Sequence, residues 1–406
     1  MSTYPGKGKV AVLKTSPETV LDDIERLMKL ADFENILPKE NTTALKINIS
    51  WQTWYPACSS TPWQLEGVIR ALKNAGYEDI VGVHNDTVVV DTSDGERNNK
   101  HIDVTNQYGI PCLYLYNQDF EWFEYTPKSR PFLVLDKVFP QGVFIPKALV
   151  GKNIIHLPTV KTHVFTTITG AMKNAFGGLL HRNRHWTHSV IHDTLVDLLM
   201  IQQEIHPGIF AVMDGTFAGD GPGPRAMRWH EKDILLASAD QVAIDATSAR
   251  LQGFDPMSIR FIRKAHEVEL GIGDPRQIEI VGYDIEQEPS WNFKQEDTFA
   301  SKGQKLIYHG PLKPLEKPLL QSPLVPWSFF ASNFYHNVYW YPFVGRPRVQ
   351  EALNTKWGRL FQQYGDGKVV MPGMEPKTIA QAVAGLTIFA AGLAAMGLVL
   401  GNRRKP

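Results

Sequence analysis

Apolar residues in the first 284 positions recur in two alternating patterns. Short apolar runs at residues 9–13, 44–50 and 79–84 are typical of buried strands. Between them, residues 19–33 and 62–76 place apolar side chains three and four positions apart, which is typical of helices with one buried face. Strands that alternate with helices at this spacing predict crossover units and a mostly parallel sheet.

A second series of the same kind follows. Apolar runs lie at 153–157, 208–213, 233–238 and 277–282, and helical patterns lie after His163, near 192–203 and at 242–253. Thr61 and Asp240 stand where helices begin, and either side chain suits an N-cap. We therefore expect an α/β body over residues 1–284, with helices flanking the sheet and two lobes that divide near residues 145–150.

The pattern changes from residue 286 onward. Residues 285–376 are rich in proline and aromatic residues without clear periodicity, and we interpret them as an irregular connector. Trp, Tyr and Phe are densest at 324–347. These rings either lie at the level of lipid headgroups or cover the α/β body.

The segment 377–406 has the pattern of a membrane anchor. Residues 378–401 carry no charge, and Gln381 is their one strongly polar side chain. At about 1.5 Å per residue this run can cross a hydrocarbon core of roughly 30 Å. We predict a single C-terminal transmembrane helix, with a buried helix of a soluble domain as the alternative. The N-terminus lacks the pattern of a secretory signal, which favours a tail-anchored protein whose body faces the cytoplasm.

Charge and cysteine content exclude several classes of partner and cofactor. Lys plus Arg and Asp plus Glu number 42 each, and no long basic run is present, so nucleic acid is not an expected partner. Cys58 and Cys112 are the chain's two cysteines. They exclude a disulfide scaffold and an iron–sulfur cluster ligated by this chain alone, and they suit a reducing compartment.

Polar residues of long reach surround one predicted strand-to-helix junction, LPTVKTHVFTTITGAMKNAFGG at 157–178. Pro158 makes central pairing beyond Leu157 unlikely, so Lys161 and His163 should lie in the loop at the carboxyl end of the strand. In open α/β sheets that edge binds ligands.

A helix that starts near Thr166 or Thr167 would present Lys173, with Asn174 beside it, among small residues. Two lysines near a helix N-terminus suit a carboxylate or phosphate. The alternative is a lysine that pairs with a carboxylate where two lobes meet.

The next segment holds His181, His185, His188 and His192 at spacings of four, three and four. On a continuous helix they would share one face. Metal binding by His185, His188 and His192 is one hypothesis, acid/base or hydrogen-bonding work is a second, and a structural role is the third. No HExxH pattern is present.

Acidic residues follow the later strands. Asp214 closes one strand, and a Gly/Pro-rich loop then carries Asp220, Gly221 and Arg225. The loop matches neither a P-loop nor a dinucleotide fingerprint, so it either shapes a substrate site or forms a tight surface turn. Asp245 lies among apolar neighbours, and as a buried carboxylate it needs a partner such as Lys161, Lys173 or a histidine.

The segments LKINIS, KTH followed by KN, VMDGTFAGDGPGP and LLASADQVAIDATSARLQG resemble the domain-of-unknown-function family 362 over most of residues 5–284. Some members carry a ferredoxin-like iron–sulfur module, which implies redox chemistry for those members; the cysteines for it are absent here. The resemblance implies a set of site residues without assigned chemistry, namely Lys46, Asn48, Lys161, His163, Lys173, Asn174, Asp214, Gly221 and Asp245.

The resulting hypothesis is a membrane-anchored enzyme that acts on a small anionic ligand. We assign catalysis to His163, Lys173 and Asp245, and ligand binding to Lys46, Asn48, Lys161, Asn174, Asp214, Asp220 and Gly221. A redox reaction with an external partner is preferred through the family association alone. The cofactor is open, and a metal is compatible with the sequence. The alternative is a non-catalytic accessory or assembly subunit of a membrane complex.

Overall fold

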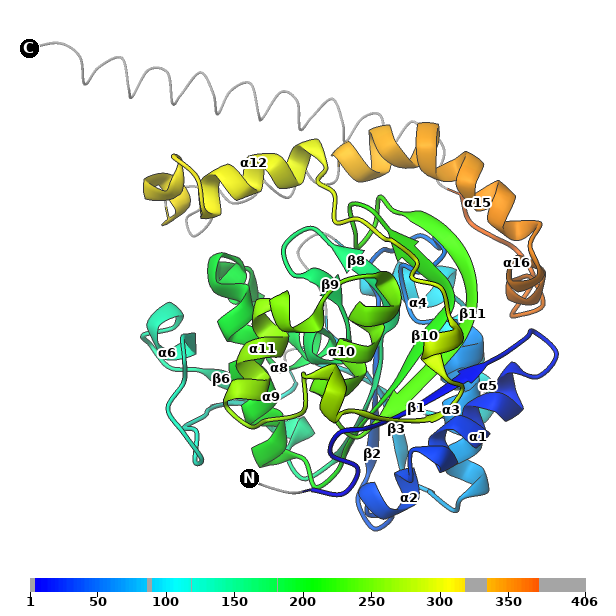
Figure 1. Cartoon of the computed structure of the whole chain (residues 1–406), viewed down its shortest axis with the longest axis horizontal. Helices are drawn as coiled ribbons and strands as arrows, with labels where there is room; N and C mark the ends of the chain where they lie inside the picture. The colour runs from blue at the N-terminus through cyan, green and yellow to red at the C-terminus, as the bar shows by residue number, and fades with distance from the viewer. Residues whose placement is uncertain (1–3, 86–89, 118, 181, 318–333, 372–406) are drawn as a thin grey trace, which may run out of the picture. The chain divides into compact units, whose positions relative to one another are not determined.

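A computed structural model describes residues 4–85, 90–117, 119–180, 182–317 and 334–371 (Figure 1). These residues fall into two compact units. The first, which we call the α/β unit, comprises the described residues up to 297 together with 351–370. The second unit comprises the described residues of 298–350 and residue 371.

A large sheet forms the centre of the α/β unit. Along its main path the strands follow the order β12 (Glu279–Gly282), β1 (Lys9–Lys14), β11 (Arg228–Ser238), β10 (Ile209–Asp220), β7 (Asn153–Leu157), β2 (Thr43–Ile47), β3 (Ile80–His84) and β4 (Cys112–Tyr114). Off this path, β8 (Thr159–His163) pairs with β10 and with β9 (Thr167–Thr169).

Most strand pairs are parallel, as the alternating pattern predicted. The run from β10 through β7, β2 and β3 to β4 is parallel throughout, whereas β11 is antiparallel to both of its neighbours. Strands β2 and β7 pair directly, with Lys46 opposite His156. One sheet thus contains strands from both sides of residues 145–150, near which the sequence predicted a division into two lobes.

Helices cover both faces of the sheet. On one face lie α1 (Val20–Leu30), α3 (Pro62–Asn74) and α5 (His101–Tyr108), and on the other lie α9 (Ile191–Ile205), α10 (Gln241–Gln252) and α11 (Arg260–Glu267) (Figure 1). Thr61 caps α3 in a reciprocal capping box, and Asp240 Oδ1 accepts the amides of Val242 and Ala243 at the start of α10. Both caps were predicted.

Shorter elements complete the α/β unit. Its remaining helices and strands are α2 (Phe33–Ile36), α4 (Thr92–Asn98), β5 (Trp122–Glu124), α6 (Leu135–Val138), β6 (Phe144–Pro146), α7 (Ala171–Asn174) and α8 (Phe176–Leu179). Single 3₁₀ turns are η1 (Lys147–Leu149), η3 (Pro256–Ser258), η4 (Pro275–Gln277) and η5 (Ile285–Gln287), while η2 (Arg182–Val190) is a longer 3₁₀ segment.

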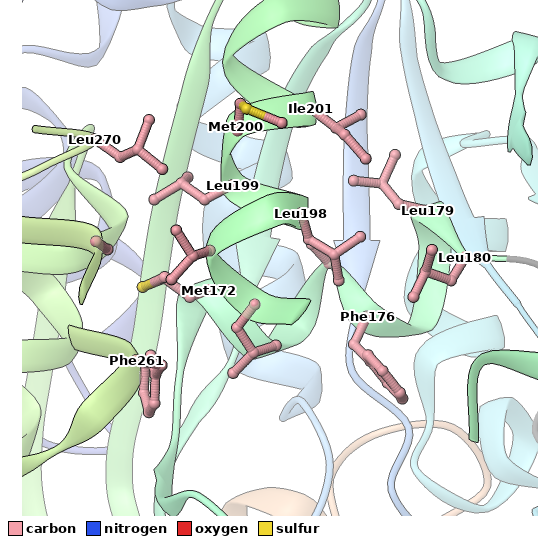
Figure 2. Close-up of a cluster of buried hydrophobic side chains, with 14 of the residues drawn as sticks. Met172, Phe176, Leu179, Leu180, Leu198, Leu199, Met200, Ile201, Phe261 and Leu270 are labelled. Atoms are coloured by element: carbon pink, nitrogen blue, oxygen red, sulfur yellow. The ribbon is translucent and has the colours of Figure 1, made fainter. Parts of the chain in front are cut away.

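The apolar core on the α9 side of the sheet holds α7 and α8 in place. Leu198 and Leu199 of α9 pack with Met172 of α7, Phe176 of α8 and Phe261 of α11 (Figure 2). Removing a buried leucine from such a cluster costs about 2–5 kcal/mol of folding free energy. Packing against this core therefore fixes α7, the short helix that carries Lys173.

The segment after Leu157 differs from the prediction. Pro158 interrupts the strand, but pairing resumes in β8, with Thr159 opposite Asp214 and Lys161 opposite Gly219 of β10. Thus Lys161 and His163 lie on a strand and not in a loop. The chain then turns back as β9, and helix α7 starts only at Ala171, so neither predicted threonine caps it.

The chain returns to the α/β unit after residue 350. Helix α15 (Arg346–Leu353) leads to α16 (Lys356–Phe361). The ring of Trp357 lies 5.3 Å from that of Trp63, and its Nε1 donates to Asp233 Oδ1 at 2.6 Å. Phe361 stacks on Trp54 with ring centroids 4.3 Å apart. The return is therefore anchored by buried aromatic rings.

The second unit contains α12 (Phe299–Tyr308), a 3₁₀ turn η6 (Lys313–Leu315), a π-helix η7 (Phe334–Gly345) and the first part of α15. The described part of the aromatic-rich stretch is helical, which corrects the prediction of an irregular connector there. Exposed fractions reach 86% for Phe299, 53% for Tyr339 and 62% for Phe343.

The predicted membrane helix at 378–401 lies outside the described residues. Among the residues that the structure does describe, no helix combines the length and the apolar character needed to span a bilayer.

Candidate functional site

Lys46 lies near the carboxyl end of β2 with its ammonium buried. Lys46 Nζ donates to its neighbour's carbonyl, Ile47 O, at 2.6 Å. A Cβ added to Gly178 would lie 3.2 Å from Lys46 Cε, so α8 passes close to this side chain. Burial, and then the positive charge of Arg184, lowers the pKa of Lys46 to about 7.

Lys161 on β8 is only 1% exposed. Its Nζ donates to Cys58 O and to Thr159 Oγ1, each at 2.7 Å. Both acceptors are neutral. Burial lowers the pKa of Lys161 to about 8, although an interaction with Cys58 opposes the shift and the charge of Lys173 adds to it.

Lys173 projects from α7 and has no hydrogen bond or ion pair with any described residue; its Nζ lies 5.6 Å from the centre of the Phe176 ring. Burial, assisted by the charge of Arg184, lowers its pKa to about 8. This ammonium is held by packing alone.

Asp245 of α10 supports the helix that carries Lys173. Its carboxylate accepts the amides of Ala171 at 2.6 Å and Met172 at 3.1 Å. A Cβ at Gly170 would lie 2.1 Å from Asp245 Oδ1, so this approach requires glycine. Burial raises the pKa of Asp245 to about 7. Its partners are therefore backbone amides, and the lysine or histidine partner that the sequence suggested is not what it contacts.

His163 presents a neutral imidazole. Its Nδ1 accepts the amide of Phe165 at 3.1 Å, so the ring proton of the neutral form lies on Nε2. Burial, and then the charge of Lys173, holds the pKa of His163 well below its usual range. At neutral pH the group is accordingly an N–H donor without charge.

Arg225 lies in the Gly/Pro-rich loop after β10 and is 8% exposed. Its Nε donates to Ser50 O at 3.1 Å, but Nη1 is buried without a hydrogen-bond partner among the described residues. Burial lowers the pKa of its guanidinium. Cys58 links it to Lys161, because Cys58 O accepts from Lys161 and Cys58 Sγ lies 3.1 Å from the carbonyl of Pro224, next to Arg225.

We call Lys46, Lys161, Lys173, Arg184 and Arg225, together with neutral His163, the basic cluster. Within the described ranges, the three lysines and Arg225 form no ion pair with a carboxylate. Isolated buried charges are costly unless a counter-charge accompanies them. An arrangement of this kind can hold an anion such as a carboxylate or a phosphate.

Two asparagines that were predicted as site residues hold backbone carbonyls beside the basic cluster. Asn174 Nδ2 donates to Lys46 O at 2.8 Å and lies 3.4 Å from His156 Nδ1. Asn48 Nδ2 donates to Cys58 O at 3.3 Å, the same carbonyl that Lys161 contacts. They fix the chain around the lysines.

The remaining predicted acidic positions are engaged elsewhere. Asp214 accepts the hydroxyl of Thr61 and the amide of Thr216, the latter at 2.6 Å. Asp220 pairs with Arg228 at 3.0 Å, and the next residue, Gly221, has a φ of 97°. Asp214 and Asp220 thus have partners within the protein, and a role for them or for Gly221 in ligand binding stays a prediction.

The histidine segment does not form one continuous α-helix. Residues 182–190 are 3₁₀-helical and α9 begins at Ile191, so the spacing of three keeps His185 and His188 on one face, but the spacing of four to His192 crosses from one helix type to the other. The His188 ring meets the rings of Phe165 and Phe176, and His192 stacks on Phe261.

The described residues bring together another set of metal-ligating atoms, which the sequence did not single out. Atoms of His84, Glu96 and Cys112 lie within 4.8 Å of one another. The position of His84 at the end of a predicted strand was a usable signal, whereas Glu96 gave none. Sequence reasoning also missed Arg184, and it noted Arg225 without giving it a role.

Comparisons with known proteins match the part of the chain that carries the basic cluster. The family described as Domain of unknown function (DUF362) matches residues 43–250, which include every member of the basic cluster. The thylakoid-associated protein sll1697 of Synechocystis sp. is 24% identical over 208 residues, and the match covers 50% of this chain and 60% of that protein. No solved structure matches the chain. Because the family match spans half of the sequence, the chain belongs to the DUF362 family, a domain of unknown function.

Proposed function

We propose that the α/β unit is an enzyme that binds a small anionic ligand at the basic cluster and acts on it through Lys173 and His163. The observation that carries this proposal is a buried guanidinium nitrogen of Arg225 without a partner among the described residues, close to lysines that also have no carboxylate. A bound anion would provide the missing counter-charge.

The electrostatics favour a ligand with more than one negative charge. The pKa values of Lys46, Lys161 and Lys173 are lowered to between about 7 and about 8, chiefly by burial. An anion among them would stabilise their protonated forms and raise these pKa values again. Phosphate, sulfate or a dicarboxylate has the charge and size for this role.

The same groups suit proton-transfer chemistry on such a ligand. Once a bound anion has raised its lowered pKa, Lys173 is protonated near physiological pH and can donate a proton to the ligand. His163 can donate its Nε2 proton in a hydrogen bond to an oxygen that becomes negative in the transition state. A redox version rests on family association alone and requires an electron carrier outside this chain.

Calorimetric titration tests the binding step. We expect sulfate, phosphate or succinate to bind the full-length chain in detergent, and Lys173→Met to weaken the binding about 10–100-fold, the worth of a lost charged hydrogen bond. Lys73→Met is the matched control, because Lys73 is an exposed lysine of α3. Equal affinity in both variants, or absence of binding by the unaltered chain, would contradict the proposal.

The second candidate is a non-catalytic accessory or assembly subunit of a membrane complex. Three features support membrane association: the exposed rings of Phe299, Tyr339 and Phe343, the apolar run at 378–401, and the description of one relative as thylakoid-associated. Turnover of a bound anion that is lost in Lys173→Met would favour the enzyme. A stable membrane complex that co-purifies unchanged with that variant would favour the accessory role.

Membrane attachment itself is tested by fractionation. We expect the full chain to remain with membranes after an alkaline carbonate wash, and a chain truncated after residue 371 to be released. Protease protection of an epitope placed after residue 406 then determines which side the tail occupies. Release of the full chain by carbonate would rule out a tail anchor.

A further inference from the structure

Three potential metal ligands meet beside the paired strands β3 and β4, outside the basic cluster. His84 ends β3, Cys112 begins β4, and Glu96 projects from α4. Their ligand atoms lie within 4.8 Å of one another, and the His84 and Glu96 side chains are buried. The set combines nitrogen, oxygen and sulfur donors.

Pairing of β3 with β4 places the cysteine in the group. Cys112 lies opposite Gly82, two residues before His84, so Gly82 and His84 face the same side of the sheet. A Cβ at Gly82 would lie 2.7 Å from Cys112 Sγ. The absence of a side chain at residue 82 therefore makes room for the thiol beside the imidazole.

The contact between His84 and Glu96 is short but is not a well-formed hydrogen bond. His84 Nε2 lies 2.7 Å from Glu96 Oε1, yet this buried nitrogen has no hydrogen-bond partner of acceptable geometry in the described structure. A proton shared between the two groups would require the N–H to point at the oxygen. The pair still interacts as a hydrogen bond in its effect on both pKa values, so the support for an ion is the closeness of the nitrogen and oxygen donors.

A second buried imidazole nitrogen lies in the same neighbourhood. His101 Nε2 contacts Ser60 O at 2.7 Å, which places the ring proton on Nε2 and leaves Nδ1 as an acceptor. That Nδ1 is buried and has no partner among the described residues. The charge of Glu96 acts on His101, which shows that this ring is close to the carboxylate.

We propose that His84 Nε2, the Glu96 carboxylate and the Cys112 thiolate bind one Zn²⁺, with the fourth position open to water or a ligand. Imidazole, carboxylate and thiolate are the donors that zinc takes in proteins, and three protein ligands with one open position are typical of catalytic zinc sites. The inference stands whether or not the basic cluster binds an anion.

The charge balance of the site suits its burial. Zn²⁺ binding replaces the thiol proton of Cys112, which passes to solvent, while Glu96 enters as a carboxylate and His84 as a neutral ring. The two positive charges of the ion thus meet two negative ligands. Lys46 lies on the adjacent strand, opposite Val83, and its charge acts on His84.

Cobalt serves as the spectroscopic probe. The full-length chain, stripped with a chelator, is titrated with Co²⁺ and then with Zn²⁺. We expect one equivalent of Co²⁺ to produce a thiolate-to-cobalt charge-transfer band that Zn²⁺ abolishes by displacement. Cys112→Ser should remove the band. It should also weaken Zn²⁺ binding by at least about 100-fold, because mutation of a residue that only hydrogen-bonds to a metal ligand already costs up to about 100-fold.

Two control variants and one variant of a proposed ligand assign the site. Cys58→Ser changes the other cysteine and should keep the band, and His188→Gln tests the histidine segment and should leave Zn²⁺ affinity unchanged. Glu96→Gln, which preserves shape, should weaken Zn²⁺ binding even if Cys112→Ser misfolds by circular dichroism. The inference is overturned if the unaltered chain binds no stoichiometric metal, if Glu96→Gln binds Zn²⁺ like the unaltered chain, or if His188→Gln abolishes binding.

Discussion

Arg225 and Arg228 lie three residues apart and have opposite surroundings. The Arg228 side chain is 41% exposed and pairs with Asp220 at 3.0 Å and Glu296 at 2.9 Å. Hydrogen bonds to these carboxylates raise its pKa, Glu296 first. Arg225 is 8% exposed, donates to the neutral carbonyl of Ser50, and has its pKa lowered by burial.

The difference separates a charge that is neutralised within the fold from one that has no counter-charge among the described residues. A half-exposed ion pair such as Arg228–Asp220 contributes about 0–1 kcal/mol. A buried charge without a counter-charge costs several kcal/mol after relaxation. Under the proposed function a bound anion supplies the missing charge, for the lysines of the basic cluster as for Arg225.

The largest expected effect is on the pH dependence of stability. The pKa of Lys161 is about 8 in the folded chain, below its usual 10.5, so between these values the unfolded chain holds a proton that the folded chain lacks. Stability without ligand should therefore rise from about pH 7 to 10, by on the order of 3 kcal/mol from Lys161 alone. Urea unfolding at several pH values measures this slope.

Saturating sulfate provides the control for that slope. Its charge is constant over this range, and as a bound anion it should raise the lysine pKa values, so the rise with pH should become smaller. The carboxyl of Asp245 does not interfere, because its pKa is raised only to about 7 and its destabilising effect is complete near that pH. A flat profile in the absence of sulfate would refute the assignment of buried, unpaired lysines.

The next largest effect is on sulfate affinity, which should differ between variants of Arg225 and Arg228. Arg225→Gln should weaken sulfate binding about 10–100-fold, because its guanidinium has a free buried donor for the anion. Arg228→Gln should change the affinity less than about twofold, because its charge is already neutralised. Calorimetric titration of both variants measures the ratio, and equal losses would remove the distinction.

A smaller effect concerns the support of Lys173. Gly170→Ala places a Cβ against the Asp245 carboxylate, and we expect it to destabilise the fold by about 1–3 kcal/mol and to disturb binding at α7. Gly178→Ala is the matched control, because its Cβ would meet the flexible Lys46 chain at 3.2 Å. Thermal unfolding compares them, and an equal loss in the two variants would contradict the role given to Asp245.

The smallest effect is on stability without ligand, which two variants should change in opposite directions. Lys173→Met should leave the stability without ligand unchanged or raise it by about 1 kcal/mol, because it removes a half-buried charge that has no hydrogen bond among the described residues. Arg228→Met should lower stability by up to about 1 kcal/mol, because it breaks a half-exposed pair. Denaturant midpoints at pH 7 report both, and a clear loss of stability in Lys173→Met would mean that its ammonium is paired.

The sheet could be predicted because its strands are short apolar runs separated by clear helical patterns; the position after an apolar run singled out Lys161, and the family resemblance singled out Lys46. The pairing of β8 with β10 could not be predicted, because it depends on a register shift with residues far along the chain. The reach of Asp245 to the amides of α7 is likewise a tertiary contact. That Arg225 lacks a partner is a property of its surroundings, which no local pattern encodes.

Helix α16, which returns to the α/β unit, imposes an order on biosynthesis. The ring of Trp63 packs on that of Trp357, yet residues 298–350 are made between the end of the first stretch of the α/β unit and this return. At roughly 5–20 residues per second, a ribosome needs several seconds to bridge that interval. The nascent chain thus exposes the indole of Trp63 until Trp357 emerges, and that interval is when a chaperone has access to it.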